Sequence, residues 1–274
     1  MTATIAARPQ LPSTTARRML PLVLAGGLVL TAIAYPLSSG PARDTVSWTI
    51  VLLGALLSVV HAGFSRGARA GAGLLVLVAL TSVAFEAIGL ATGVPYGSYR
   101  YGTALGPTLL GVPFLVPLAW LMMAWPSRLL ADRLTRGVRS GRRPAARIGA
   151  AAVVFAGWDV VLDPQMVQAG YWTWAHPRPG LPGIPTVPLT NLAGWLLAGL
   201  VLMALLEVLV ARVALPGGPR IGAAAPLLAL AWMTLGGALA HAGWLGLPGS
   251  AAWGVALAVP VGLVLLVQRR RARR

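Results

Sequence analysis

The 274-residue sequence contains no cysteine and no lysine. Without cysteine it can have no disulfide framework, thiolate nucleophile or cysteine metal site. Acidic residues are also scarce: six Asp and Glu stand against 22 basic residues, all arginine, for a net charge of +16. Only 10% of the chain is charged, 57% is hydrophobic, and the mean hydropathy is +0.76. This balance is rare in soluble domains and typical of a polytopic membrane protein.

The strong positive charge raises nucleic acid as a potential partner. The arginines, however, lie in short loops between apolar runs and do not form a basic domain. No aromatic-rich RNA-binding signature or helix-turn-helix context accompanies them. We therefore expect no nucleic acid partner, and we expect the lipid bilayer to surround the chain.

Eight apolar runs approach the length of about 20 residues that a membrane-spanning helix needs. The sequence thus predicts an all-α, polytopic integral membrane helix bundle with about eight transmembrane helices. We expect a single transmembrane domain over residues 19–268, between basic tails at 1–18 and 269–274. The predicted helices cover residues 19–36, 46–64, 70–91, 104–125, 146–163, 190–211, 222–244 and 250–268.

The arginines predict the orientation of this bundle. All of them except Arg43, Arg100 and Arg178 lie in the two tails or in loops on one side. By the positive-inside rule, both termini are then cytoplasmic, and we expect a multi-pass protein of the plasma membrane. The first apolar run follows Arg17 and Arg18 as a signal peptide would, but we favour a retained helix, as in most polytopic proteins.

Three acidic residues lie near predicted helix ends on the arginine-poor side. Glu86 is near the end of the third helix, and Asp159 and Asp163 are near the end of the fifth. The i, i+4 spacing places the two aspartates on one helix face, roughly 6 Å apart, and Pro164 predicts that the helix stops there. Helix carboxyl ends and apolar surroundings disfavour the charged carboxylate. We hypothesise that at least one of the three is a protonated acid that donates a proton to a substrate.

Other polar and aromatic residues are predicted to lie at the same outer end. Asn191 opens the sixth helix, and the loops 92–103 and 164–189 carry tyrosines and tryptophans. Two alternatives stay open: a membrane carboxylate is often an interhelical hydrogen-bonding strut, and tyrosine or tryptophan at a helix end is often an interface anchor. We interpret His61, Glu207 and His241 as structural.

Five motifs surround these polar residues. The chain reads E-x-x-G-x-x-T-G-x-P-Y-G-x-Y-x-Y from Glu86, L-G-x-x-x-x-G-V-P from Leu105 with Trp120 after it, W-D-x-x-x-D-P from Trp158, W-x-W from Trp172 and V-P-x-x-N-x-x-G-W from Val187. Together they resemble the CruF-type carotenoid hydratase family, whose members hydrate the acyclic end groups of C40 and C50 carotenoids. The resemblance covers roughly residues 80–200 by motif.

The resemblance implies a lyase that adds water across the terminal 1,2 double bond. Protonation of carbon 2 gives a tertiary cation at carbon 1, water adds there, and a carboxylate takes up the proton of the water. No redox cofactor or metal is implied. The implied partners are a lipophilic substrate, lycopene or a C50 precursor, and other carotenoid biosynthesis enzymes. Asp159 or Glu86 would be the acid and Asp163 would orient the water. The implied substrate-binding residues are Tyr96, Tyr99, Tyr101, Trp158, Trp172, Trp174, Asn191 and Trp195.

Rival functions remain. Asp159-x-x-x-Asp163 mimics half of the Mg²⁺-diphosphate site of an intramembrane prenyltransferase, but a second acidic cluster is missing and the aspartates lie on the arginine-poor side. Three scattered histidines do not supply the ligands of a di-iron hydroxylase. A transporter or a non-catalytic pigment-binding protein would use a similar aromatic cavity, although transport favours broken helices at the membrane midplane.

Overall fold

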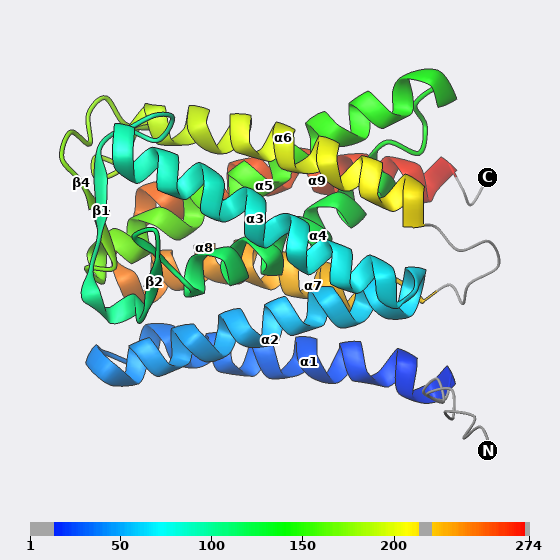
Figure 1. Cartoon of the computed structure of the whole chain (residues 1–274), viewed down its shortest axis with the longest axis horizontal. Coiled ribbons are helices and arrows are strands. Elements are labelled where there is room, and N and C mark those ends of the chain that lie inside the picture. Colours follow the sequence, from blue (N-terminus) through cyan, green and yellow to red (C-terminus); the bar gives the residue numbers. More distant parts are fainter. Residues whose placement is uncertain (1–13, 214–220, 272–274) are drawn as a thin grey trace, which may run out of the picture.

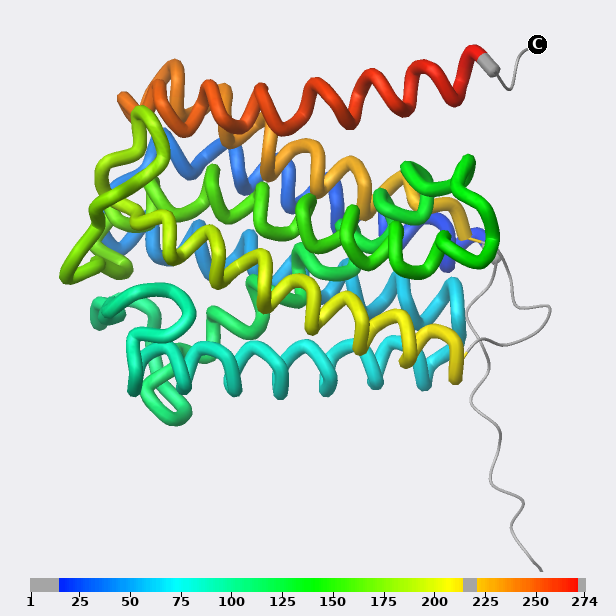
Figure 2. The backbone as a smooth tube through the Cα atoms, turned by 90° about the horizontal axis from the view of Figure 1, so that it is seen from above, coloured from blue at the N-terminus to red at the C-terminus, as the bar shows by residue number. Residues whose placement is uncertain are grey.

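The computed structural model describes residues 14–213 and 221–271, which form a bundle of long helices running back and forth along one axis (Figure 1). The helix α9 runs along one edge of this bundle (Figure 2). The long helices are α1 (Thr14–Ala34), α2 (Gly40–Arg66), α3 (Ala68–Thr92), α4 (Leu115–Leu134), α5 (Arg143–Gln168), α6 (Leu189–Val213) and α9 (Pro248–Arg271). An eighth long run joins α7 (Ala224–Ala231), the π-helical η4 (Trp232–Gly236), α8 (Gly237–Ala240) and the π-helical η5 (His241–Leu245).

Seven of the described helical segments are long and apolar enough to cross a membrane, which confirms the prediction of an all-α, multi-pass membrane bundle. The helix α4 is not among the seven, because Arg128, Asp132 and Arg133 make its second half too polar. It contacts α2, α3, α5, α7 and α9, so protein surrounds most of it. Its buried residues include Ser127 and Arg128, because a helix shielded by protein can carry polar groups that lipid would not tolerate.

The two ends of the bundle differ in character. The start of α1 and the end of α9 lie at one end, which we call the arginine end, and the short strands lie at the other, which we call the strand end (Figure 1). The start of α1 and the end of α9 therefore lie on the same side, and the number of about eight passes stays a prediction. The assignment of the arginine end to the cytoplasm, and of residues 1–18 and 269–274 to basic tails, stays a prediction, and residues 1–13 and 272–274 lie outside the described part.

The prediction of the fourth helix over residues 104–125 was wrong by about ten positions. Residues 103–113 instead form η2 (Thr103–Leu105) and the short antiparallel strands β2 (Thr108–Leu109) and β3 (Val112–Pro113), and α4 continues to Leu134. Gly106 and Gly111 adopt positive φ angles of 80°, which few other residues accept. Polar residues lower the hydropathy of the second half of α4, so the apolar run in the sequence ends before the helix does.

The prediction that Pro164 ends the fifth helix was also wrong. The helix α5 continues to Gln168 with Pro164 inside it. Proline removes one backbone hydrogen bond, but buried helices tolerate it where neighbouring segments hold the chain. Here the Trp172–Trp174 strand and α6 pack on this part of α5. Asp159 and Asp163 therefore sit well inside the helix, still on one face.

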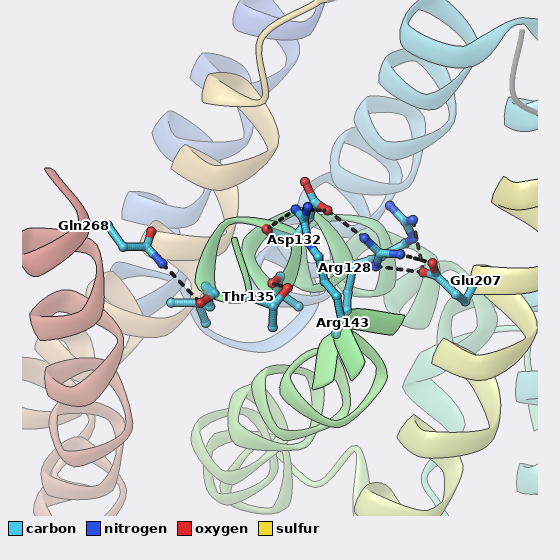
Figure 3. A network of polar contacts seen from close by, with 9 residues as sticks. Arg128, Asp132, Thr135, Arg143, Glu207 and Gln268 are labelled. Carbon is cyan, nitrogen blue, oxygen red and sulfur yellow. Dashed lines mark hydrogen bonds and ion pairs between the residues drawn. The ribbon is translucent and has the colours of Figure 1, made fainter. Parts of the chain in front are cut away.

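A network of ion pairs and hydrogen bonds ties four helices together at the arginine end (Figure 3). Glu207 of α6 accepts hydrogen bonds from Arg128 of α4 at 3.1 Å and from Arg147 of α5 at 2.9 Å. Arg147 also pairs with Asp132 at 2.8 Å. The amide of Gln268 in α9 donates to the carbonyl of Leu134 at 3.1 Å. His61 is likewise held in place, since its Nδ1 accepts from Trp125 at 3.0 Å. These contacts support the interpretation of Glu207 and His61 as structural residues.

We expect Glu207→Gln to lower the free energy of unfolding by about 1–3 kcal/mol, the cost of weakening hydrogen bonds to charged groups. The substitution removes the charge that faces two arginines, one of which has a side chain only 4% exposed. Asp132→Asn is the matched control, and its effect should be smaller because the Asp132 side chain is 36% exposed. Thermal unfolding in detergent measures both. Equal midpoints for Glu207→Gln and the parent chain would contradict this role.

Candidate active site

Two short strands that are distant in sequence pair at the strand end. The strand β1 (Tyr99–Tyr101) runs antiparallel to β4 (Trp172–Trp174), with Tyr99 opposite Trp174 and Tyr101 opposite Trp172. Successive side chains of a strand point to opposite faces, so these four aromatic side chains share one face of the ribbon. The ring centroids of Tyr101 and Trp172 are 5.9 Å apart and those of Tyr99 and Trp174 are 6.0 Å apart. The ribbon thereby presents an aromatic surface to the helix ends.

The turn between α3 and β1 is built around Tyr96. Its side chain is buried against Gly89 of α3 and Gly194 of α6. A Cβ at Gly194 would lie 2.6 Å from Cδ1 of Tyr96, and one at Gly89 would lie 2.8 Å from Cδ2. The two glycines are therefore needed to admit the ring. Trp174 fixes the same turn, because its Nε1 donates to the Tyr96 carbonyl at 3.0 Å.

Glu86 lies beneath the ribbon, in the last turns of α3. Its Oε2 accepts hydrogen bonds from the hydroxyls of Tyr99 and, at 2.7 Å, Tyr101. Burial and the nearby Glu86 carboxyl both raise the pKa of Tyr99 and of Tyr101 above the usual value for tyrosine. Both hydroxyls therefore keep their protons and donate them to these hydrogen bonds. Since both converge on Oε2, the second oxygen of Glu86 is left for other contacts.

The two aspartates form a second cluster with Asn191 of α6. The Nδ2 of Asn191 donates to Oδ2 of Asp159 at 2.9 Å and to Oδ2 of Asp163 at 2.5 Å. Trp172 of the ribbon donates from Nε1 to Oδ1 of Asp163 at 3.1 Å. Both oxygens of Asp163 thus accept hydrogen bonds. Oδ1 of Asp159, in contrast, is buried and has no hydrogen-bond partner among the described residues.

The carboxylates of this end differ from those of the arginine end in their partners. Glu207 and Asp132 pair with arginines. The hydrogen-bond partners of Glu86, Asp159 and Asp163 are tyrosine, tryptophan and asparagine, which are all neutral. Taking a carboxylate out of water without a cation is costly, so such surroundings favour the neutral acid. Two aspartates that share one amide donor add mutual repulsion in the same direction.

A cavity of about 350 Å³ brings the two clusters together. Of the residues predicted for the site, Asp159 alone does not line it. The others line its strand-end part, namely Glu86, Tyr96, Tyr99, Tyr101, Trp158, Asp163, Trp172, Trp174, Asn191 and Trp195. The hydroxyl of Tyr96 is buried without a hydrogen-bond partner in the described part of the chain. Within residues 14–213 and 221–271, no group of three His, Cys, Asp or Glu side chains is placed to hold a metal ion.

Sequence reasoning missed part of the lining. Trp120 of α4 packs against Trp195, with ring centroids 5.0 Å apart, and its motif position after Gly-Val-Pro was the available signal. Tyr171 donates to Oδ1 of Asp44 at 2.7 Å, and burial together with this carboxylate raises its pKa to about 12. Gln165 also lines the cavity and accepts a hydrogen bond from His241 at 3.0 Å. No spacing rule points to Tyr171 or Gln165.

Comparison with known proteins identifies the family to which the chain belongs. It is 39% identical over 142 residues to a bisanhydrobacterioruberin hydratase of Haloarcula japonica, a match that covers 51% of this chain and 45% of that relative. The matched region thus spans about half of either protein. No solved structure is significantly similar. The sequence profile of the carotenoid biosynthesis proteins matches residues 46–266, which contain both carboxylate clusters and the aromatic ribbon. The chain therefore belongs to the carotenoid biosynthesis protein family.

Proposed function

We propose that this protein is a carotenoid hydratase, which adds water to the terminal 1,2 double bond of an acyclic carotenoid and so produces a tertiary alcohol. The observation that carries the proposal is the cavity lined by the buried carboxyl groups of Glu86 and Asp163, whose hydrogen-bond partners are neutral. Hydration of an isolated alkene requires a proton donor and a base that orients and deprotonates water, and a protonated carboxyl group and a carboxylate can fill these two roles. The similarity to a protein named as a hydratase supports the same reaction.

Glu86 is the proton donor in this proposal. It lines the cavity, whereas Asp159, the other candidate, does not. The two tyrosine hydroxyls occupy Oε2 of Glu86, which leaves Oε1 to carry the proton. Transfer of this proton to carbon 2 of the end group breaks the double bond and leaves a tertiary cation at carbon 1. The aromatic faces around the cavity stabilise such a cation, as they do other cations.

Asp163 orients the water. It lines the cavity, and both of its oxygens accept hydrogen bonds, which suits a carboxylate that acts as a base. The water oxygen bonds to carbon 1, and Asp163 takes the released proton. Asn191 links Asp163 to Asp159, so the two aspartates share a single negative charge. Turnover is complete when a proton from solvent or from Asp163 returns to Glu86, and the balance is one water added per double bond.

Expression in a host that accumulates lycopene, and in one that accumulates an acyclic C50 carotenoid, tests this proposal. We expect pigments heavier by one or two waters in at least one host, identified by mass spectrometry of the extracts, and none with the empty vector. Unchanged pigments in both hosts, with the protein present in the membrane fraction, would overturn it. A prenylated product, or activity lost on chelating Mg²⁺, would instead indicate a prenyltransferase.

A further inference from the structure

The cavity has a second part that the hydration chemistry does not use. Its lining continues from Trp120 and Met122 to residues of α1 and η1 (Tyr35–Leu37) on one side and of η4, α8 and η5 on the other. We propose that this part is a lateral opening through which a long acyclic polyene reaches the carboxylates from the membrane, and in which the middle of the chain stays bound. The inference rests on the proposed function, since it names the route of the substrate.

Exposed residues show where the cavity opens. Four apolar residues line it and are also largely exposed on the surface of the bundle, which residues around a closed cavity would not be. Their exposed fractions are 45% for Ile33, 69% for Leu37, 60% for Leu239 and 59% for Trp244. All four lie within segments long and apolar enough to cross a membrane. The opening is therefore directed sideways into lipid, and not along the bundle axis into water.

Packing contacts on either side of the opening hold its two walls at a fixed separation. The helix α1 contacts α7, and η1 contacts η5, so the two sides meet above and below the opening. Between these contacts the cavity is lined by small residues, which include Ala32 on one side and Gly236, Gly237 and Ala240 on the other. The π-helical turns η4 and η5 flank this stretch. Such turns are rare and are frequently found at functional sites.

The size and chemistry of the cavity identify its occupant. About 350 Å³ is near the lower end of the ~300–1,000 Å³ typical of ligand pockets, so the cavity holds only part of a long chain. Trp232 and Trp244 line the opening, and their faces suit a flat conjugated polyene. Glu86 and Asp163 line the part of the cavity formed by α3, α5 and the aromatic ribbon, and α1, η1, η4, α8 and η5 line the other part. One end group therefore fits at Glu86 and Asp163 while the remaining chain leaves between α1 and α8.

Filling the opening with a large side chain tests this route. Ala240→Trp and Ala32→Trp narrow it from opposite sides. Ala231→Trp is the matched control, because Ala231 belongs to the same helical run, is exposed and does not line the cavity. Each variant is expressed in the host whose carotenoid the parent chain hydrates. We expect the hydrated fraction to fall by about tenfold or more in both lining variants, as steric misfit in an apolar pocket produces, and to stay within about twofold of the parent in the control.

Two further measurements separate a blocked route from a damaged site. Purified Ala240→Trp should still hydrate geraniol, a short isoprenoid with the same dimethyl-alkene end, at the rate of the parent chain. It should also retain less carotenoid per protein after purification than Ala231→Trp. Equal hydration of the long carotenoid by all three variants, or a parallel loss on geraniol, would overturn the inference. If Ala240→Trp fails to accumulate in the membrane, the same measurements are made on Ala32→Trp and compared with Ala231→Trp.

Failure of the proposed function would give a different pattern. If the parent chain hydrates neither substrate, the hydratase proposal falls, and the amount of carotenoid retained still tests the opening. Less retained pigment in Ala240→Trp than in Ala231→Trp would then support a polyene-binding route. Equal retention would contradict it, as would purified protein that carries membrane phospholipid in the cavity in place of carotenoid.

Discussion

Glu86→Gln is expected to lower the yield of hydrated carotenoid by about 10²–10⁴-fold, the contribution of a general acid. The glutamine amide has nearly the same shape, and its oxygen still accepts the hydrogen bonds of Tyr99 and Tyr101. It has no acidic proton to transfer to carbon. The chemistry is thus removed while the packing is kept. Mass analysis of pigments from the carotenoid-producing host measures the effect, normalised to the amount of protein in the membrane.

Two control variants show whether the loss is specific to the carboxyl group of Glu86. Asp132→Asn removes a carboxylate at the arginine end, outside the cavity, and should leave hydration within about twofold of the parent. Tyr101→Phe keeps the carboxyl group of Glu86 and removes one of its hydrogen bonds, so we expect a smaller loss, roughly tenfold. If Glu86→Gln retained parental activity while Asp159→Asn were inactive, Asp159 would be the proton donor.

The grouping of the polar residues followed from two patterns in the sequence. Apolar runs of membrane-spanning length predicted the helices except for the bounds of α4, and the uneven arginines predicted which loops share an end. These patterns suffice to bring Glu86, Asp159, Asp163 and Asn191 to one end of a bundle. The i, i+4 spacing then placed the two aspartates on one face of α5, where a single amide of α6 reaches both. The motifs added that the chain resembles carotenoid hydratases, and the family match confirms carotenoid biosynthesis.

The rest depends on tertiary contacts that no local pattern encodes. Tyr99–Tyr101 and Trp172–Trp174 are three-residue strands, too short to give a signal of their own, and each is stabilised only by the other. Pro164 stays helical because the surrounding protein supports α5 at that point. The lateral opening requires α1 and the α7–η5 run to lie side by side, although they are about 200 residues apart. Hydropathy identifies both as membrane helices and says nothing about which helices are neighbours.

Asp163→Asn is expected to abolish net hydration to a similar extent, about 10²–10⁴-fold, for a different reason. Both oxygens of Asp163 accept hydrogen bonds from fixed donors, Trp172 and Asn191. Whichever way an asparagine amide faces, its NH₂ group meets one of these donors, and it cannot take a proton from water. Asp159→Asn should lose less, roughly tenfold, because Asp159 does not line the cavity and its oxygen can still accept from Asn191.

Deuterium exchange separates these two roles. Purified protein is incubated with acyclic carotenoid in D₂O, and the unreacted carotenoid is examined for deuterium. In Asp163→Asn, Glu86 still delivers a deuteron to carbon 2 and can take a proton back, so we expect exchange into the substrate without net hydration. In Glu86→Gln neither exchange nor hydration should occur, because no cation forms. Exchange that persists in Glu86→Gln and disappears in Asp163→Asn would reverse the two assignments, since the residue needed for exchange is the one that protonates the double bond.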